Sequence, residues 1–484
     1  MKNKNQVIII IYLFFIFSAA FMLRFYHLSF FEFKNDQLYA ILLGSQARQA
    51  HFLITHGMYS GVGINNPPYF IYLMGIFTYF TSDPYFLTAF FTFLNLLALL
   101  ISFWYFCSFL PTTYAVLSST LLAFSPAFTI YSTNIWAQCS LPIFLIFFNL
   151  CFYKFIQEEK PAYFVILNLL AGITGQIHMS GFFLFPALLI SGFKYRRVIK
   201  KIHIFFISVF IFIIFLPYIY YLFGEGGTKS VFAYAERNKD IPWNIFRSHL
   251  WITSLDSLRI YFRNDFLNIL RHSLGVWGFV LYPFTFIIPG LFILGFIYYI
   301  KFLKKEKSLF NKNSDSYPLP FQISGFLVSV VTLSYFVFQM RTPLHYLIVL
   351  FPCHAIITSF GAWKFWKYGI VRVATVTSII ITTVFLLVAL RFLDEAGGHW
   401  CQYGPSYKML KGLRSKIQSL TQGKLCPDLK LALPKTGKFD EAAIRFVLLK
   451  DQPCKNDAKL LPIKLSIAWD NKAMRYVYTF TNGE

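Results

Sequence analysis

The chain has 484 residues, of which 57% are hydrophobic and 13% are charged, and Phe alone accounts for 60. A soluble domain carries about 25% charged residues, so this composition excludes a soluble protein and requires a bilayer to take up the apolar surface. The formal net charge of +23 does not indicate nucleic-acid binding, because the basic residues form short clusters between apolar runs, as cytoplasmic loops do. We therefore predict an all-α polytopic membrane protein.

The first apolar run extends from Val7 to Leu23 and is just long enough to span the bilayer. No small-x-small cleavage site precedes Arg24, so we expect a retained helix and not a signal peptide. Lys2 and Lys4 place its N-terminus in the cytoplasm.

A polar and aromatic loop follows at 24–66 and is expected to lie outside. Within it, apolar residues recur at helical spacing from Asp36 to Ala50, which predicts an amphipathic helix at the membrane interface. A Pro-Pro pair then opens a short apolar segment, 67–80, which we interpret as interfacial or re-entrant.

Ten further apolar runs bring the predicted number of transmembrane helices to eleven. The basic clusters between them alternate as expected for cytoplasmic loops, and an odd number of helices places the tail outside. A second long loop, 224–272, is also outside, although it is basic. The predicted domains are a transmembrane domain, 1–391, and an outside domain, 392–484. The ten runs are 84–107, 114–131, 135–156, 162–177, 180–193, 202–223, 275–300, 319–338, 344–361 and 373–391.

The tail is predicted to be a small soluble α/β domain. Its segments KLALPK and RYVYTF are typical of strands, and FDEAAIRFVLL is typical of a helix. Three cysteines, Cys401, Cys426 and Cys454, lie in this tail, and two of them could pair if it faces an oxidising compartment.

Asp36 is the first candidate functional residue, because it lies close to the outer end of the first helix. A carboxylate there could accept a proton from an attacking hydroxyl or bind a divalent cation. The alternative is a helix N-cap, since an amphipathic helix follows.

Several motifs recur over about residues 10–200: Arg24, Asp36, the turn Asn66-Pro67-Pro68-Tyr69, Leu122–Pro126, Tyr131–Asn134 and Gly172–His178. Together they resemble the glycosyltransferases of the GT-C fold. The similar group is the family of the protein O-mannosyltransferases and the lipid A aminoarabinose transferase.

The resemblance implies a hexosyl- or pentosyltransferase that takes a sugar from a polyprenyl-phosphate carrier on the outer face and transfers it with inversion. The acceptor is a hydroxyl or phosphate on a lipid, a protein or a glycan. Asp36 matches the family's acid, which is a base or a metal ligand. Asp36-Gln37 replaces the common Asp-Glu, and Asn66 replaces a charged residue before the Pro-Pro turn. Both departures argue against metal dependence, so a divalent cation is not strongly implied.

The carrier phosphate needs cations around it as negative charge develops. Arg341 and His345 are four residues apart at the outer mouth of a span, next to Tyr346, and would share a helical face. Arg259 and Arg263 are also four apart. The alternative for these arginines is snorkelling or solvation.

His178 lies between two apolar runs at the expected outer surface. Ionisable groups at such positions are candidates for function, and the alternative is a histidine that is hydrogen-bonded in the core.

Two other functions remain open: a flippase or transporter of lipid-linked glycans, and an O-antigen-type polymerase or ligase. A transporter should carry polar groups in mid-span, and Asn95, Asn149 and Asn168 are the main ones here. The expected partners are a polyprenyl-phosphate-linked sugar, membrane lipid and an acceptor, without nucleic acid. The expected location is a bacterial inner membrane.

Overall fold

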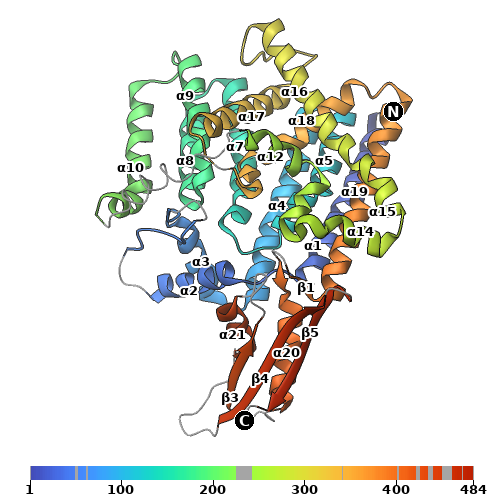
Figure 1. The fold of residues 1–484 in the computed structure, drawn as a ribbon. Coiled ribbons are helices and arrows are strands. Elements are labelled where there is room, and N and C mark those ends of the chain that lie inside the picture. Colours follow the sequence, from blue (N-terminus) through green and yellow to red (C-terminus); the bar gives the residue numbers. More distant parts are fainter. Residues whose placement is uncertain are drawn as a thin grey trace.

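The computed structural model of the chain is mostly helical, with small sheets near the C-terminus (Figure 1). It describes residues 2–49, 53–60, 64–224, 243–340, 342–400, 403–420, 426–433, 440–449, 460–470 and 473–482.

Seven helical segments in the described part of the chain are long and apolar enough to cross a membrane. A bent pair makes an eighth, in which η6 (Leu344–Leu350) meets α18 (Cys353–Lys364) at 76°. The seven are Ile9–Leu28 in α1 (Lys2–Leu28), α4 (Pro84–Phe109), η1 (Ala137–Ser140) with α7 (Leu141–Glu158), α10 (Lys201–Gly224), α15 (Trp277–Leu281) through η5 (Tyr282–Phe286) to α16 (Ile287–Glu306), α17 (Leu319–Val337) and α19 (Gly369–Ala396).

The predicted count of eleven spans is not confirmed. The run 114–131 breaks at Ser125-Pro126, because proline starts a new helix more readily than it continues one. Two other runs form helices that are shorter than a typical span. These segments are α5 (Thr112–Ala123), α6 (Pro126–Tyr131), α8 (Pro161–Ile177), η2 (Met179–Leu184) and α9 (Phe185–Lys194).

The helix expected in the first loop is present as α2 (Asn35–Gln49), and the Pro-Pro segment forms α3 (Tyr69–Phe80). The two helices pack closely at Gly44, where an added Cβ would lie 2.7 Å from the Cβ of Met74. Glycine is therefore required here by the close approach, although it weakens a helix. Both helices lie at the end of the bundle that carries the C-terminal sheet (Figure 1).

The described part of the second long loop is folded into short helices. Their apolar side chains, such as Leu255, Leu258 and Ile269, are buried together with residues of α19. The helices are α12 (Asn244–Ile252), η3 (Leu255–Leu258), α13 (Arg259–Phe262), η4 (Arg263–Asp265) and α14 (Phe266–Leu274).

The tail contains the strands and helix that its sequence predicts. A three-stranded sheet has the order β3-β4-β5, with β3 parallel and β5 antiparallel to β4. The helix α21 follows β3 and precedes its parallel partner β4, as a parallel crossover requires. The elements are β1 (Gly398–His399), β2 (Gly404–Pro405), α20 (Tyr407–Leu420), β3 (Cys426–Ala432), α21 (Glu441–Leu449), β4 (Leu460–Asp470) and β5 (Arg475–Asn482). Because Cys401 and Cys454 lie outside the described residues, so does the predicted disulfide.

Candidate functional site

A polar cavity of about 110 Å³ brings together five of the residues that the sequence predicts. Asp36 reaches it from α2, Asn66 from the turn before α3, His178 from the junction of α8 and η2, and His345 and Tyr346 from η6. Its remaining lining residues are Met58, Tyr59, Ser60, Trp136, Ala137 and Gln138. Five segments that are distant in sequence therefore meet at one cavity.

Three residues of this wall carry buried polar atoms without a hydrogen-bond partner among the described residues. These atoms are Asn66 Oδ1, Trp136 Nε1 and His345 Nδ1. An unpartnered buried polar atom costs about 1–3 kcal/mol, so proteins rarely keep several in one place without a ligand. An indole N–H only donates and an amide oxygen only accepts. The wall is therefore suited to a ligand that both accepts and donates, as sugar hydroxyls do.

His178 is held on both sides of its ring. Its Nδ1 accepts a hydrogen bond from the backbone N–H of Ser180 at 3.2 Å, and its Nε2 lies 2.8 Å from Nε2 of Gln138. Because an amide nitrogen only donates, Gln138 donates to Nε2 of the ring, and Nδ1 also lies 2.8 Å from the hydroxyl oxygen of Ser180. Of the two interpretations that the sequence left open, His178 fits the hydrogen-bonded buried histidine, and it also lines the cavity.

The turn that carries Asn66 is stabilised by its own backbone. Gly57 N donates to Asn66 O at 2.6 Å, and Asn66 N donates to Met58 O at 2.8 Å. Tyr218 of α10 donates its hydroxyl to Asn65 O at 2.8 Å. The side-chain amide of Asn66 donates to Met58 O at 3.2 Å, which leaves its Oδ1 as the unpartnered acceptor of the cavity wall.

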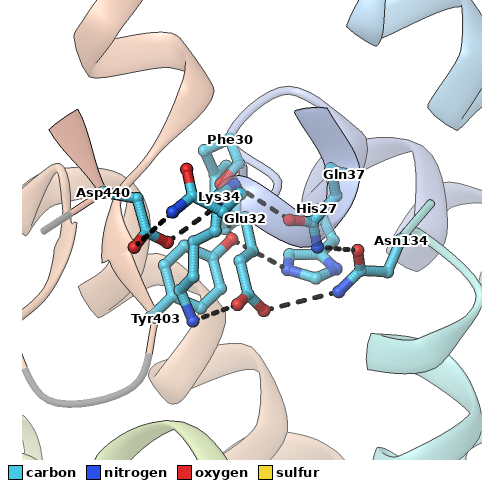
Figure 2. Close-up of polar contacts among 9 residues, drawn as sticks. His27, Phe30, Glu32, Lys34, Gln37, Asn134, Tyr403 and Asp440 are labelled. Atoms are coloured by element: carbon cyan, nitrogen blue, oxygen red, sulfur yellow. Dashed lines mark hydrogen bonds and ion pairs between the residues drawn. The ribbon is translucent and has the colours of Figure 1, made fainter. Parts of the chain in front are cut away.

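Asp36 is exposed and is the second residue of α2. It is not the N-cap, because Lys34 O accepts the first helical bond, from Leu38 N, at 3.0 Å. The residue after it, Gln37, is buried, and its Nε2 donates to Asn134 Oδ1 at 2.6 Å (Figure 2). The carboxylate of Asp36 therefore lies at the rim of the cavity. The next residue, Gln37, anchors this part of the backbone through its bond to Asn134.

Glu32 is a buried carboxylate that the sequence analysis missed. It is 2% exposed, forms an ion pair with Lys34 and accepts a bond from Asn134 Nδ2 at 3.4 Å. Burial raises the pKa of its carboxyl; Lys34 opposes that shift, and the nearby charge of Asp36 adds to it. An acid inside the aromatic run Phe30–Phe33 was the signal that could have found it.

Next to Glu32, a second group of polar contacts joins α1 to the tail (Figure 2). His27 Nε2 lies 3.2 Å from the hydroxyl of Tyr403, and that hydroxyl donates to Phe30 O at 2.5 Å. The other ring nitrogen of His27 contacts the hydroxyl of Thr133. The predictions did not include His27, Thr133 or Tyr403 as functional residues.

The predicted arginines do not join the cavity wall in the described part of the chain. Arg259 Nε lies 2.8 Å from Asp256 Oδ1, and its Nη2 donates to the hydroxyl of Tyr282 at 3.4 Å. Arg263 begins η4 and is not among the lining residues. Arg341 lies outside the described residues.

A metal site is not formed by the described residues, which contain no cluster of three or more His, Cys, Asp and Glu side chains suited to an ion. Asp36 is the single carboxylate among the described lining residues. Glu32 is buried against Lys34 instead.

The chain is similar to known proteins both in sequence profile and in fold. The sequence profile of the family described as dolichyl-phosphate-mannose-protein mannosyltransferase matches residues 65–221, a segment that includes Asn66, Trp136 and His178. Among curated protein sequences, none matches this chain.

Two solved structures share the fold along nearly the whole chain. The apo structure of ArnT from Cupriavidus metallidurans matches with a TM-score of 0.52 and 10% identity, covering 99% of this chain and 98% of that chain. The structure of the same protein bound to undecaprenyl phosphate matches with a TM-score of 0.50 and 12% identity, covering 96% and 97%. The chain is therefore an integral membrane protein of the GT-C fold that resembles the family of the protein O-mannosyltransferases and the lipid A aminoarabinose transferase.

Proposed function

We propose that this protein is a membrane glycosyltransferase that moves a sugar from a polyprenyl-phosphate carrier to an acceptor hydroxyl on the outer face of the membrane. The observation that carries the proposal is the cavity, where the carboxylate of Asp36 meets the unpartnered atoms of Asn66, Trp136 and His345. Such a wall is complementary to a hydroxyl-rich ligand next to a base. The matched family profile, and the undecaprenyl phosphate bound by ArnT, support a lipid-phosphate donor.

The proposed reaction is a single displacement with inversion. Asp36 accepts the proton of the acceptor hydroxyl as its oxygen bonds to the anomeric carbon, while the bond from that carbon to the carrier phosphate breaks. The phosphate leaves with the bonding electrons, so it needs positive charge nearby. We assign that task to the segment 341–346, which brings His345 and Tyr346 to the cavity and contains Arg341.

The orientation of the chain belongs to the same proposal. The N-terminus, with Lys2 and Lys4, lies at the end of the bundle opposite the C-terminal sheet (Figure 1), and basic residues favour the cytoplasmic side. Residues 392–484 and the α2 end of the bundle are then outside, where the acceptor is met.

The structure offers less support for a transporter. The mid-span amides all donate to the carbonyl one helical turn earlier: Asn95 to Phe91, Asn149 to Leu145 and Asn168 to Phe164, each at 2.8 Å. These amide nitrogens are bound to their own helices and are not directed toward a substrate pathway.

The test is sugar transfer by the purified protein from a labelled polyprenyl-phosphate sugar, with product separated from carrier. Because a general base contributes about 10²–10⁴-fold, Asp36→Asn should lower the rate by at least about 100-fold. Asp83→Asn is the matched control, since Asp83 caps α4 through Tyr85 N at 2.8 Å, away from the cavity. Unchanged transfer by Asp36→Asn would remove the base assignment, and flipping in proteoliposomes without a covalent product would favour a flippase.

A further inference from the structure

The helix that carries Asp36 begins without a capping side chain of its own at the N-cap. Lys34 occupies that position, and its side chain has no acceptor. Gln37 reaches back, and its Oε1 accepts from Lys34 N at 2.9 Å, which is one half of a capping box. The N–H of Asn35, the first residue of α2, must find an acceptor elsewhere, as the first N–H groups of every helix must.

Asp440 supplies this acceptor from the C-terminal tail. Its Oδ2 accepts from Asn35 N at 3.2 Å, and its Oδ1 accepts from Asn35 Nδ2 at 3.1 Å (Figure 2). The two residues are 405 positions apart in sequence. One carboxylate therefore binds both the backbone and the side chain of the residue that directly precedes Asp36.

Asp440 is also placed at the start of a helix, because its carbonyl accepts from Ile444 N at 3.0 Å at the beginning of α21. An aspartate in this position ordinarily accepts from an N–H of its own first turn. The side-chain bonds found here go to α2 instead. The N-termini of α2 and α21 therefore share one negative charge, which the partial positive charge of each helix end favours.

A second set of contacts fixes the residues just before α2 to the same tail. Tyr407 N donates to Phe31 O at 3.0 Å, and the rings of these two residues stack with their centroids 4.8 Å apart. The hydroxyl of Tyr403 donates to Phe30 O. The approach to Asp36 is thus bound to the tail at three successive points, at Phe30, Phe31 and Asn35.

We infer that Asp440 is a positioning residue for Asp36, and that the C-terminal tail completes the scaffold of the catalytic loop by capping α2 from outside that helix. This inference rests on the proposed role of Asp36 as the base. A displacement of about 1 Å in a reacting group costs on the order of 100-fold in rate. The cap therefore acts on turnover and not on binding of the donor.

The activity test compares Asp440→Ala, Asp440→Asn and Asp470→Ala. The first removes both acceptors, and the second keeps one oxygen that can accept from Asn35 N. The third is the matched control, since Asp470 caps a turn inside the tail through Ala473 N at 3.0 Å. We expect Asp440→Ala to lower kcat at least about 10-fold with an unchanged KM for the donor, Asp440→Asn to lie between it and wild type, and Asp470→Ala to match wild type.

A second measurement reports on the cap without using activity. Hydrogen exchange of the amides from Asn35 to Leu38 should be at least about 10-fold faster in Asp440→Ala than in Asp470→Ala or wild type, because the helix start loses its acceptor. Equal exchange in the three proteins would overturn the inference, and so would a loss of kcat that Asp470→Ala reproduces. If the wild-type protein transfers no sugar, the proposed function fails, whereas the exchange result still decides whether Asp440 holds α2.

Discussion

Two neighbouring polar regions of this protein differ in how completely their buried groups are paired. Around Glu32, the contacts of Lys34, Gln37 and Asn134 form a connected network. At the cavity, buried atoms of Asn66, Trp136 and His345 lack partners among the described residues, whereas near Glu32 this holds for Asn35 Oδ1, and Glu32 Oε1 is paired with Lys34. Paired buried groups rigidify a structure, and unpaired ones are retained at a cost. The comparison separates a paired network from the proposed ligand site, and α2 contributes residues to both.

The largest effect on stability is expected from Asn134→Ala, which breaks the paired region. The change removes the acceptor of Gln37 Nε2 and the donor to Glu32, and it leaves both side chains buried. The cost of such groups predicts a loss of about 2–4 kcal/mol in the free energy of unfolding. Thermal unfolding in detergent measures it, with the exposed Asn313→Ala as control. Equal stability of the two variants would show that the network does not act as a scaffold.

Trp136→Phe changes the cavity wall. In contrast to Asn134→Ala, it should leave stability nearly unchanged and lower sugar transfer. It keeps an aromatic ring in the wall but removes an N–H that has no partner among the described residues. We expect the free energy of unfolding to change by less than about 0.5 kcal/mol, whereas transfer falls about 10-fold through the lost bond to substrate. Sugar transfer and unfolding of the same sample provide both values. Trp104→Phe, at an exposed position on α4, is the control, and equal transfer by both variants contradicts a sugar-binding role.

The smallest effect is expected from Glu32→Gln, and it appears in the pH dependence of stability. Because burial raises the pKa of Glu32 in the folded protein, the folded state holds that proton to a higher pH than the unfolded chain does. The stability linked to this proton is present below the unfolded pKa and is lost as pH rises through the folded pKa. Glu32→Gln should therefore flatten the decline of Tm that begins above the unfolded glutamate pKa of about 4.3. A parallel decline in the two proteins would show that the buried carboxyl is not coupled to folding.

Sequence patterns predicted more of the residues that line the cavity than of the residues that hold α2 in place. Asp36, Asn66, His178, His345 and Tyr346 came from local motifs, and the structure brings all five to one wall. Arg259, chosen by helical spacing, instead pairs with Asp256. The four-residue spacing of Arg259 and Arg263 could not show this, because α13 ends at Phe262. Arg263 follows with a φ of 49°, so the two arginines do not share a continuous helix. The count of eleven spans is not confirmed for a similar reason, since composition does not reveal where a run breaks into short helices.

The sequence by itself determined the membrane class, most of the long apolar helices, the start of α2 near Asp36, and the strands β3 and β5 with the helix α21 in the tail. These features depend on composition and on periodicity within a few residues, which act locally along the chain. The tertiary structure alone decided which buried polar groups are paired and which have no partner among the described residues. A hydrogen bond forms only within about 3 Å, and the partners of Asn35 and Gln37 lie 405 and 97 positions away in sequence. Asp440 therefore gains its place beside Asp36 from the packing of the tail and not from any pattern near it.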